Sequence, residues 1–209
     1  MFTFLQAADS QIDDVVSLVQ RVYEASGYIK AGEENKIGSF LYRTDLATSV
    51  CAYYNKQLIG TVSVVFDSKQ GLPMDAIYRS ELQLIRDRQQ PIAEVCQFAI
   101  DRSILIDVPL LVRKKAEAEL ALQLLALIIK YCQEQGLYYI SFAINPKHRF
   151  FYETLGAELI GVEKKYDSVN DAPALGYLFS LDRDLDNNLP FFLRRARSQI
   201  EPLFKDVFR

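Results

Sequence analysis

One carboxylate of this sequence stands in strongly apolar surroundings. Glu94 interrupts the apolar run Ile92–Ile100, which is expected to form a strand. Burial disfavours the charged form of a carboxylate and raises its pKa toward the neutral range, where a general base works best. Glu94 is therefore a candidate base or a group that orients a substrate. The alternative is a structural ion pair, with Arg21 or Arg43 as the partner.

Two more side chains with acid–base chemistry stand four positions apart. Residues 145–155 are expected to form a short helix that Gly156 closes, and this spacing places His148 and Tyr152 on one face. His148 is the only histidine of the chain, which excludes a histidine-rich metal site. Two interpretations of His148 stay open: it orients a substrate or cofactor group, or it is a surface or capping residue at a helix start.

Three consecutive basic residues, Arg113, Lys114 and Lys115, open the longest expected helix, residues 113–135. Cations at a helix N-terminus oppose the helix dipole, whereas an anion such as a phosphate is favoured there. The triplet is therefore either part of an anion-binding site or a solvated basic face. The whole chain carries a net charge of −3, and such a surface is not expected to attract DNA or RNA.

The composition is that of a cytoplasmic globular domain. A chain of 209 residues suffices for one sizeable core. Its three cysteines, Cys51, Cys96 and Cys132, are far apart, which suits a reducing compartment. Cys96 has no base beside it in the sequence, so we expect it to line a site rather than act as a nucleophile. We expect no signal peptide and no transmembrane segment, because no run reaches the roughly 18 apolar residues that a span requires.

Hydrophobic periodicity and turn residues predict the order of the elements. Helices are expected at 10–27, 75–88, 113–135 and 145–155, and strands at 48–54, 58–66, 91–100, 138–144, 157–166 and 174–181. The long crossover helix argues that strands 91–100 and 138–144 are parallel, in the middle of an otherwise antiparallel sheet. The fold class is therefore α/β (α+β). Residues 189–209 are expected to form an amphipathic helical tail.

The order of several short motifs indicates a protein family. The segment 145–161, Asn-Pro-Lys-His-Arg-Phe-Phe-Tyr-Glu-Thr-Leu-Gly-Ala-Glu-Leu-Ile-Gly, resembles the GNAT acyltransferase segment in which an Asn leads into a helix ending in Tyr-x-x-x-Gly-Phe. Here Ala157 stands in place of the usual aromatic residue. Other motifs occur in the order found in long-chain N-acyl amino acid synthases and the related acyl-homoserine-lactone synthases. These are Arg21-Val22-Tyr23, Gly27-Tyr28-Ile29, Asp45, Leu58-Ile59-Gly60-Thr61, Gly71-Leu72-Pro73 and Ala93-Glu94-Val95-Cys96-Gln97-Phe98.

The resemblance implies a GNAT-like domain, which we expect over residues 1–183. The resemblance does not cover the tail, residues 184–209, which we expect to pack on the domain. It implies a mostly antiparallel sheet, flanking helices, and a central parallel strand pair that splays apart. The implied activity is transfer of an acyl group from acyl-CoA or from the phosphopantetheine of an acyl carrier protein to an amine, such as that of an amino acid. No metal is implied. The tail could instead lie on a membrane surface, cover an acyl tunnel or contact a second subunit, since the oligomeric state is open.

The resemblance also assigns roles to individual residues. Glu94 is the implied base and Tyr152 the acid for the departing sulfur, while Asp45 and Cys96 belong to the acceptor site. The implied contacts to the acyl donor come from Gln97, Phe98, Ala99, Ile100, Arg113, Lys114, Lys115, Asn145 and His148. In a regular strand Glu94, Cys96 and Phe98 share one face, but a β-bulge, common here in GNAT strands, would switch that alternation.

The chain departs from this family pattern at three places. Ser63 and Gln97 stand where the subfamily usually carries arginines, and Leu110–Lys115 replaces the glycine-rich phosphate loop of acetyl-CoA enzymes. Without those glycines a pyrophosphate is held less closely, which favours a carrier-protein phosphopantetheine over free CoA. Two alternatives stay open: an acetyl-CoA-dependent N-acetyltransferase, and a catalytically silent fold that binds an acyl thioester.

Overall fold

The computed structural model describes residues 2–32, 36–43, 45–181 and 189–208. The strands are β1 (Thr3–Gln6), β2 (Ala47–Tyr54), β3 (Gln57–Phe66), β4 (Ile92–Ile100), β5 (Tyr139–Ile144), β6 (Glu158–Leu159), β7 (Lys164–Tyr166) and β8 (Ala172–Ser180). The α-helices are α1 (Ile12–Ala25), α2 (Asp75–Arg86), α3 (Leu110–Glu134), α4 (Arg149–Leu155), α6 (Phe191–Ile200) and α7 (Phe204–Val207). Short 3₁₀ helices are η1 (Asp9–Gln11), η2 (Lys36–Tyr42), η3 (Arg102–Leu105), η4 (Pro146–His148) and η5 (Asp167–Val169).

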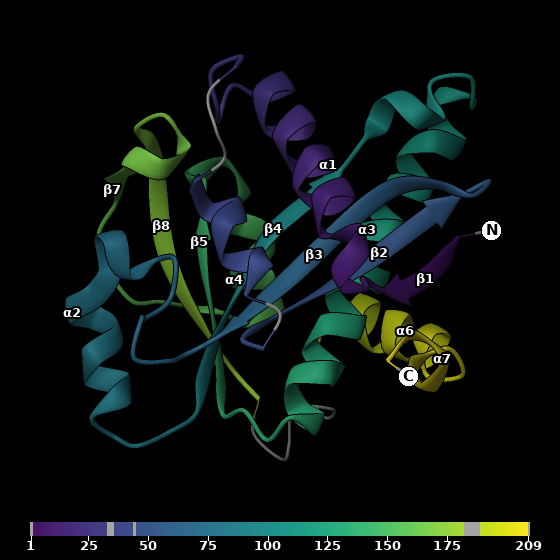
Figure 1. The fold of residues 1–209 in the computed structure, drawn as a ribbon. Helices are drawn as coiled ribbons and strands as arrows, with labels where there is room; N and C mark the ends of the chain where they lie inside the picture. Colours follow the sequence, from purple (N-terminus) through teal and green to yellow (C-terminus); the bar gives the residue numbers. More distant parts are fainter. Residues whose placement is uncertain (1, 33–35, 44, 182–188, 209) are drawn as a thin grey trace.

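The strands form one mixed sheet with a parallel pair at its centre (Figure 1). The order is β1-β2-β3-β4-β5-β8-β6, and β7 pairs with β8 off this path. β4 and β5 run parallel, whereas every other pairing among the described strands is antiparallel. α3 is the crossover between the two parallel strands. The expected fold class and the expected position of the parallel pair are therefore confirmed.

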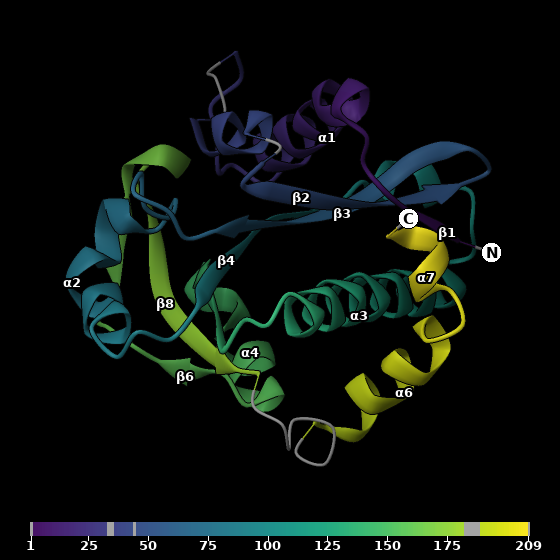
Figure 2. The ribbon, with the colours of Figure 1, turned by 60° about the horizontal axis from the view of Figure 1, so that its bottom comes forward.

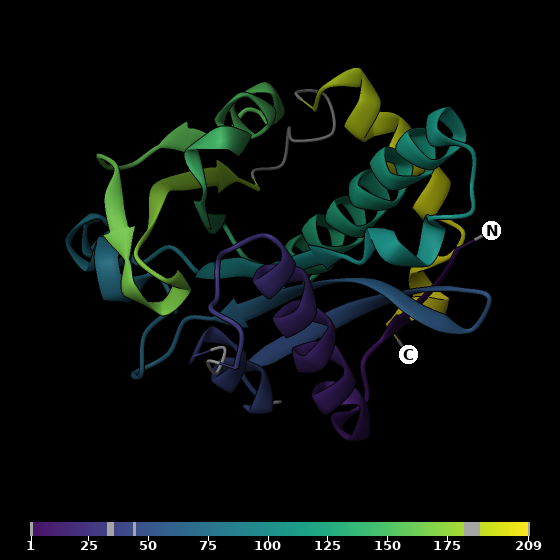
Figure 3. The ribbon, with the colours of Figure 1, turned by 90° about the horizontal axis from the view of Figure 1, so that it is seen from above.

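Helices cover both faces of the sheet, and Figure 2 shows α1 and α3 on opposite sides of β2 and β3. α1 and α2 share one apolar core, to which Ile12, Val15 and Leu82 contribute. α3, α4, α6 and α7 share the other core, around side chains such as Leu124 and Leu193. In Figure 3, α1 (purple) crosses the blue strands β2 and β3. Because helices cover both faces, a functional site is expected where two neighbouring strands of the sheet separate, between the two layers of helices.

The expected strand 157–166 is interrupted, and a tyrosine from α2 explains the interruption. β6 and β7 are separate, and Tyr78 lies beside the chain between them, donating its hydroxyl to the carbonyls of Val162 and Ala174 at 2.9 and 2.8 Å. A side chain at Gly161 would place its Cβ 2.8 Å from the Tyr78 ring. The chain therefore bends around this buried ring, which no pattern within 157–166 could reveal.

The ends of the long helix and of the chain differ slightly from expectation. α3 begins at Leu110, so that Pro109 precedes its first turn and the basic triplet lies within the first two turns. α6 packs on α3, where Arg197 donates to Gln133 at 2.8 Å and Lys130 pairs with Glu201 at 3.0 Å. The expected boundary at residues 183–184 lies outside the described residues. Among those that are described, no helix is both long and apolar enough to cross a membrane.

Candidate functional site

The parallel strands β4 and β5 separate toward their carboxyl ends (Figure 1). They pair only through Ile92–Tyr139, Ala93–Ile140 and Glu94–Ser141. At the last of these pairs, the Ser141 hydroxyl donates to the Ala93 carbonyl at 3.2 Å. Beyond it β4 continues to Ile100 and β5 to Ile144, but these two described strands no longer pair with each other. The two strands therefore enclose a wedge whose closed end is at Glu94.

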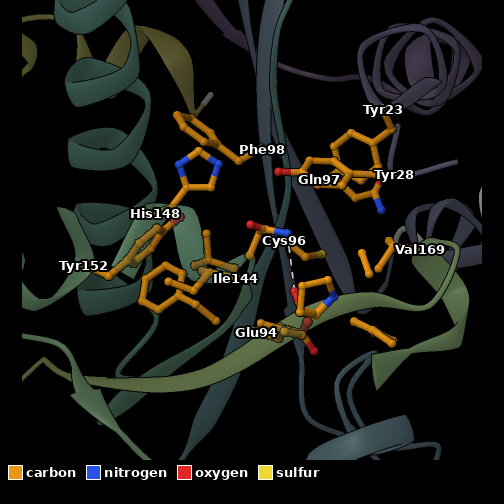
Figure 4. Close-up of a pocket in the computed structure, with 18 of the residues that line it drawn as sticks. Tyr23, Tyr28, Glu94, Cys96, Gln97, Phe98, Ile144, His148, Tyr152 and Val169 are labelled. Carbon is orange, nitrogen blue, oxygen red and sulfur yellow. Dashed lines mark hydrogen bonds between the residues drawn. The ribbon is translucent and has the colours of Figure 1, made fainter. Parts of the chain in front are cut away.

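A β-bulge in β4 lies where the wedge opens. Cys96 is opposite Ser63 of β3 and Ala99 is opposite Thr61, so Gln97 and Phe98 together face the single residue between them. Gln97 has φ of 52°, in the left-handed region that the first residue of a G1-type bulge adopts. Figure 4 shows the result: Phe98 lies toward α3, whereas Gln97 lies toward α1. The bulge thus sends two neighbouring side chains to the two sides of the wedge.

A cavity of about 210 Å³ fills the wedge. Several residues predicted from the sequence line it, namely Glu94, Cys96, Gln97, Phe98, Asn145, His148 and Tyr152. The lining also includes residues that the sequence did not single out as site residues, among them Tyr23, Tyr28, Phe142, Phe151 and Tyr166. Tyr23 and Tyr28 stand inside the motifs Arg21-Val22-Tyr23 and Gly27-Tyr28-Ile29, which was the available signal. Tyr166 carried no such signal, because it reaches the cavity from β7.

Glu94 is buried at the closed end of the wedge, with 1% of its surface exposed. Burial raises the pKa of its carboxyl from 4.5 to about 8, although the backbone N–H of Met74 donates to Oε2 at 2.7 Å and opposes this rise. Neither arginine of the ion-pair alternative contacts it: Arg21 pairs with Asp101 at 3.5 Å, and Arg43 donates to Ser68 at 3.2 Å. The Glu94 carboxyl group is therefore mostly protonated at pH 7, and it loses its proton near pH 8.

The segment that holds Glu94 is itself fixed by a network of charges. The Asp75 carboxylate accepts from the backbone N–H of Leu72 at 2.6 Å. Arg86 pairs with Asp75 and with Asp67, each at 2.7 Å. Tyr166 donates its hydroxyl to the Pro73 carbonyl at 2.9 Å. The residues around Met74 are therefore held from both sides, and so is the N–H that contacts Glu94.

Phenol groups and one thiol line the cavity together with Glu94. Burial raises the pKa of Tyr23, of Tyr152 and of Tyr166, so these side chains stay protonated and can donate at neutral pH. Burial also raises the pKa of the Cys96 thiol well above its ordinary value. A thiol that stays protonated is a poor nucleophile. The site thus offers proton donors around one carboxyl group rather than an activated cysteine.

The short helix after β5 brings three polar residues to the edge of the cavity. The Asn145 side chain accepts from the backbone N–H of Lys147 at 3.2 Å and donates to the Pro173 carbonyl at 3.4 Å. Burial against the cavity, together with the charges of Lys147 and Arg102, lowers the pKa of His148, so its imidazole is neutral at pH 7. The Tyr152 ring packs edge-on against Phe142, with the ring centres 5.0 Å apart.

The remaining predicted site residues lie outside the described cavity lining. Ala99 and Ile100 extend β4 past the bulge, and Asp45 is exposed just before β2. Arg113 faces Glu117 at 3.9 Å, while Lys114 and Lys115 are exposed on α3. No group of three or more potential metal-ligating side chains is found within the described ranges.

Comparison with known proteins places this geometry in a family. The sequence model of N-acyl amino acid synthase FeeM matches residues 14–180. The solved structure of FeeM, an N-acyl amino acid synthase from uncultured soil microbes, is 31% identical, with 90% of this chain and 94% of that chain covered and a TM-score of 0.76. None of the curated protein sequences matches the chain.

More distant structures share the fold. The CoA-dependent acyl-homoserine lactone synthase BjaI is 13% identical, with 96% of this chain and 90% of that chain covered and a TM-score of 0.62. An N-acetyltransferase from Staphylococcus aureus Mu50 is 16% identical, with 87% and 98% covered and a TM-score of 0.55. The family resemblance of the motifs is confirmed by the FeeM matches: the chain belongs to the N-acyl amino acid synthase FeeM family and is an N-acyltransferase.

Proposed function

We propose that this N-acyltransferase moves an acyl group from a phosphopantetheine thioester to the amine of an amino acid. The observation that carries the proposal is the buried carboxyl group of Glu94, at the closed end of a cavity between two separating parallel strands. A thiol-linked arm can enter such a wedge from its open end. The acceptor amine then meets the thioester carbonyl beside Glu94, whose ionised carboxylate can accept its proton.

The reaction divides among the residues of the wedge. The amine must lose a proton because an ammonium ion has no lone pair for attack. Glu94 accepts that proton as the N–C bond forms, and N–H donors along the bulged part of β4 stabilise the oxyanion. The C–S bond then breaks, and Tyr152 protonates the leaving thiolate and regains its proton from solvent. Cys96 forms no covalent intermediate, so transfer is direct.

The donor is proposed to be carried by a protein, in the cytoplasm. Arg113, Lys114 and Lys115 supply positive charge for one phosphate, and no glycine-rich loop is present to enclose a pyrophosphate. The three residues before the triplet are apolar and exposed: Leu111 exposes 83% of its surface, and Leu110 and Val112 are more than half exposed. An apolar, basic surface suits an acidic carrier protein better than a free nucleotide. BjaI is described as CoA-dependent, so acyl-CoA is the second donor to test.

The test compares donors and acceptors in one assay. Purified protein receives acetyl, octanoyl or dodecanoyl groups, each as a CoA thioester or on an acyl carrier protein, with a mixture of the twenty common amino acids. Thiol release is followed by absorbance, and N-acyl products are identified by mass spectrometry. The proposal expects N-acyl amino acids and faster transfer from the carrier protein. Exclusive use of acetyl-CoA would replace it with the acetyltransferase alternative, and the absence of any N-acyl product would overturn it.

A further inference from the structure

The cavity has two chemically different sides (Figure 4). Phe98, His148 and Tyr152 lie on the side toward α3, whereas Gln97, Tyr23 and Tyr28 lie toward α1. The α1 side therefore presents hydroxyl and amide groups, which favour a polar ligand. Since the basic triplet of α3 lies on the opposite side, the α1 side is available to the second substrate.

Tyr28 carries a polar atom without a partner. Its hydroxyl oxygen is buried and has no hydrogen-bond partner within the described part of the chain. The Tyr28 ring is held edge-on by Tyr23, with the ring centres 5.6 Å apart. A buried hydroxyl that makes no hydrogen bond is costly, and native proteins usually satisfy such a group with a ligand or with water. Tyr166, also part of the cavity lining, already uses its hydroxyl on the Pro73 carbonyl.

The side chain of Lys147, in the 3₁₀ helix η4 that follows β5, lies over the ring of the same tyrosine. The Lys147 ammonium is 4.5 Å from the centre of the Tyr28 ring. Lys147 follows β5 and Tyr28 follows α1, so the two side chains meet across the mouth of the wedge. The backbone of Lys147 is fixed by its hydrogen bond to the Asn145 side chain. Its side chain forms no salt bridge with any of the described carboxylates, so a positive charge stands over the ring that carries the unsatisfied hydroxyl.

We propose that the hydroxyl of Tyr28 and the ammonium of Lys147 bind the carboxylate of the amino-acid acceptor. This inference rests on the proposed function. Both groups donate hydrogen bonds and one is charged, so their complement is an anionic acceptor group with two oxygens. One carboxylate oxygen accepts from Tyr28 and the other pairs with Lys147. The α-amine of the same molecule then points inward, toward Glu94.

The test uses acceptors that differ only in the carboxylate. The protein receives the best acyl donor and either amino acids or the matching amino-acid amides, and steady-state kinetics are measured for the best pair. Wild-type protein is expected to prefer the acid. Tyr28→Phe and Lys147→Gln are each expected to raise the KM for the amino acid by about tenfold or more, because each removes a hydrogen bond to a charged group. The KM for the acyl donor and turnover of the amide should not change.

Two exposed residues of the same types serve as matched controls. Tyr138→Phe and Lys205→Gln alter exposed residues outside the cavity lining and should behave as wild type. The inference is overturned if wild-type protein uses the amides as well as the acids. It is also overturned if Tyr28→Phe and Lys147→Gln both keep the wild-type preference for the acid. Transfer to amines without carboxylate selectivity would leave the proposed acyl transfer standing. No transfer to any amine would overturn both.

Discussion

At the scale of single residues, Glu94 combines complete burial with one backbone hydrogen bond and no cation. A carboxyl group whose pKa rises on folding binds a proton more tightly in the native than in the unfolded state. Its protonated form therefore stabilises the fold fully below the ordinary pKa of 4.5, and this contribution is lost as pH rises toward about 8. The same burial that suits Glu94 to act as a base near neutrality makes the protein less stable at alkaline pH.

The loss of stability with rising pH can be tested with a variant that does not titrate. Glu94→Gln removes the titrating group but keeps a side chain of the same shape beside Met74. Relative to wild type, the variant should gain on the order of 2–4 kcal/mol in unfolding free energy between pH 5 and pH 9. Urea unfolding at the two pH values measures the difference. An equal gap between the two proteins at both values would show that the carboxyl group does not titrate abnormally.

The proposed role of Tyr152 predicts a dependence on the leaving group. Tyr152→Phe removes the proton donor and keeps the ring contact with Phe142. Turnover of an alkyl thioester should fall roughly 10²-fold, because an alkyl thiolate needs the proton most. An aryl thioester, whose thiolate leaves readily without help, should lose much less. Equal losses with both donors would contradict an acid role, and Tyr138→Phe serves as the control.

The sequence predicted the residue types of the site better than their surroundings. The apolar run around Glu94 predicted its burial, because a strand in the middle of a sheet is covered on both faces. Its hydrogen-bond donor, the N–H of Met74, could not be predicted, since that contact joins positions twenty residues apart, with α2 between them. For the same reason Tyr166 was missed: it lies far from the other cavity residues in the chain.

At the scale of elements, the start of α2 acts as a support for the site. Arg86, in the last turn of α2, holds Asp75 at its first turn and Asp67 after β3, and these contacts fix the segment that carries Met74. The sequence predicted the helix but not this clamp. It also predicted the parallel pair from the length of the crossover, whereas the position of the bulge depends on the register with β3, which only the assembled sheet defines.

Breaking the Arg86 clamp should affect both stability and the base. Arg86→Met leaves two carboxylates unpaired and should cost roughly 2–4 kcal/mol of unfolding free energy. Loosening the Met74 N–H should also raise the pKa of Glu94 further. This moves the ascending, acidic limb of the pH–rate profile, which reports deprotonation of the base, to higher pH. Arg86→Lys should restore part of each effect. Arg79→Met, an exposed arginine on the same helix, is the control. A stability loss without any change in the pH profile would limit Arg86 to a structural role.

At the scale of the whole molecule, the C-terminal tail belongs to the same apolar core as α3. Leu193 on α6 has no exposed surface, and Phe208 stacks on Tyr131 of α3 with ring centres 4.5 Å apart. The sequence predicted an amphipathic tail from its periodicity. Packing on the domain was the expected arrangement, although one apolar face would also suit a membrane surface, an acyl tunnel or a second subunit.

Shared packing predicts that damage to the tail destabilises the whole protein. Leu193→Ala should lower the unfolding free energy by roughly 2–4 kcal/mol, since it leaves a cavity against α3. Phe191→Ala, at a side chain 74% exposed on the same helix, should be nearly neutral. Urea unfolding followed by fluorescence and by circular dichroism measures both. Two separate transitions, or no effect of Leu193→Ala, would mean that the tail is independent of the domain.

The central claim is that Glu94, at the closed end of the wedge, takes the proton of the attacking amine. The most direct measurement compares N-acyl product formation by wild-type protein and Glu94→Gln at saturating acyl donor, with donor affinity measured in parallel by calorimetry. We predict that kcat falls about 10²- to 10⁴-fold while the donor Kd stays the same. Retention of wild-type turnover by Glu94→Gln, in a protein that binds the donor normally, would contradict the account.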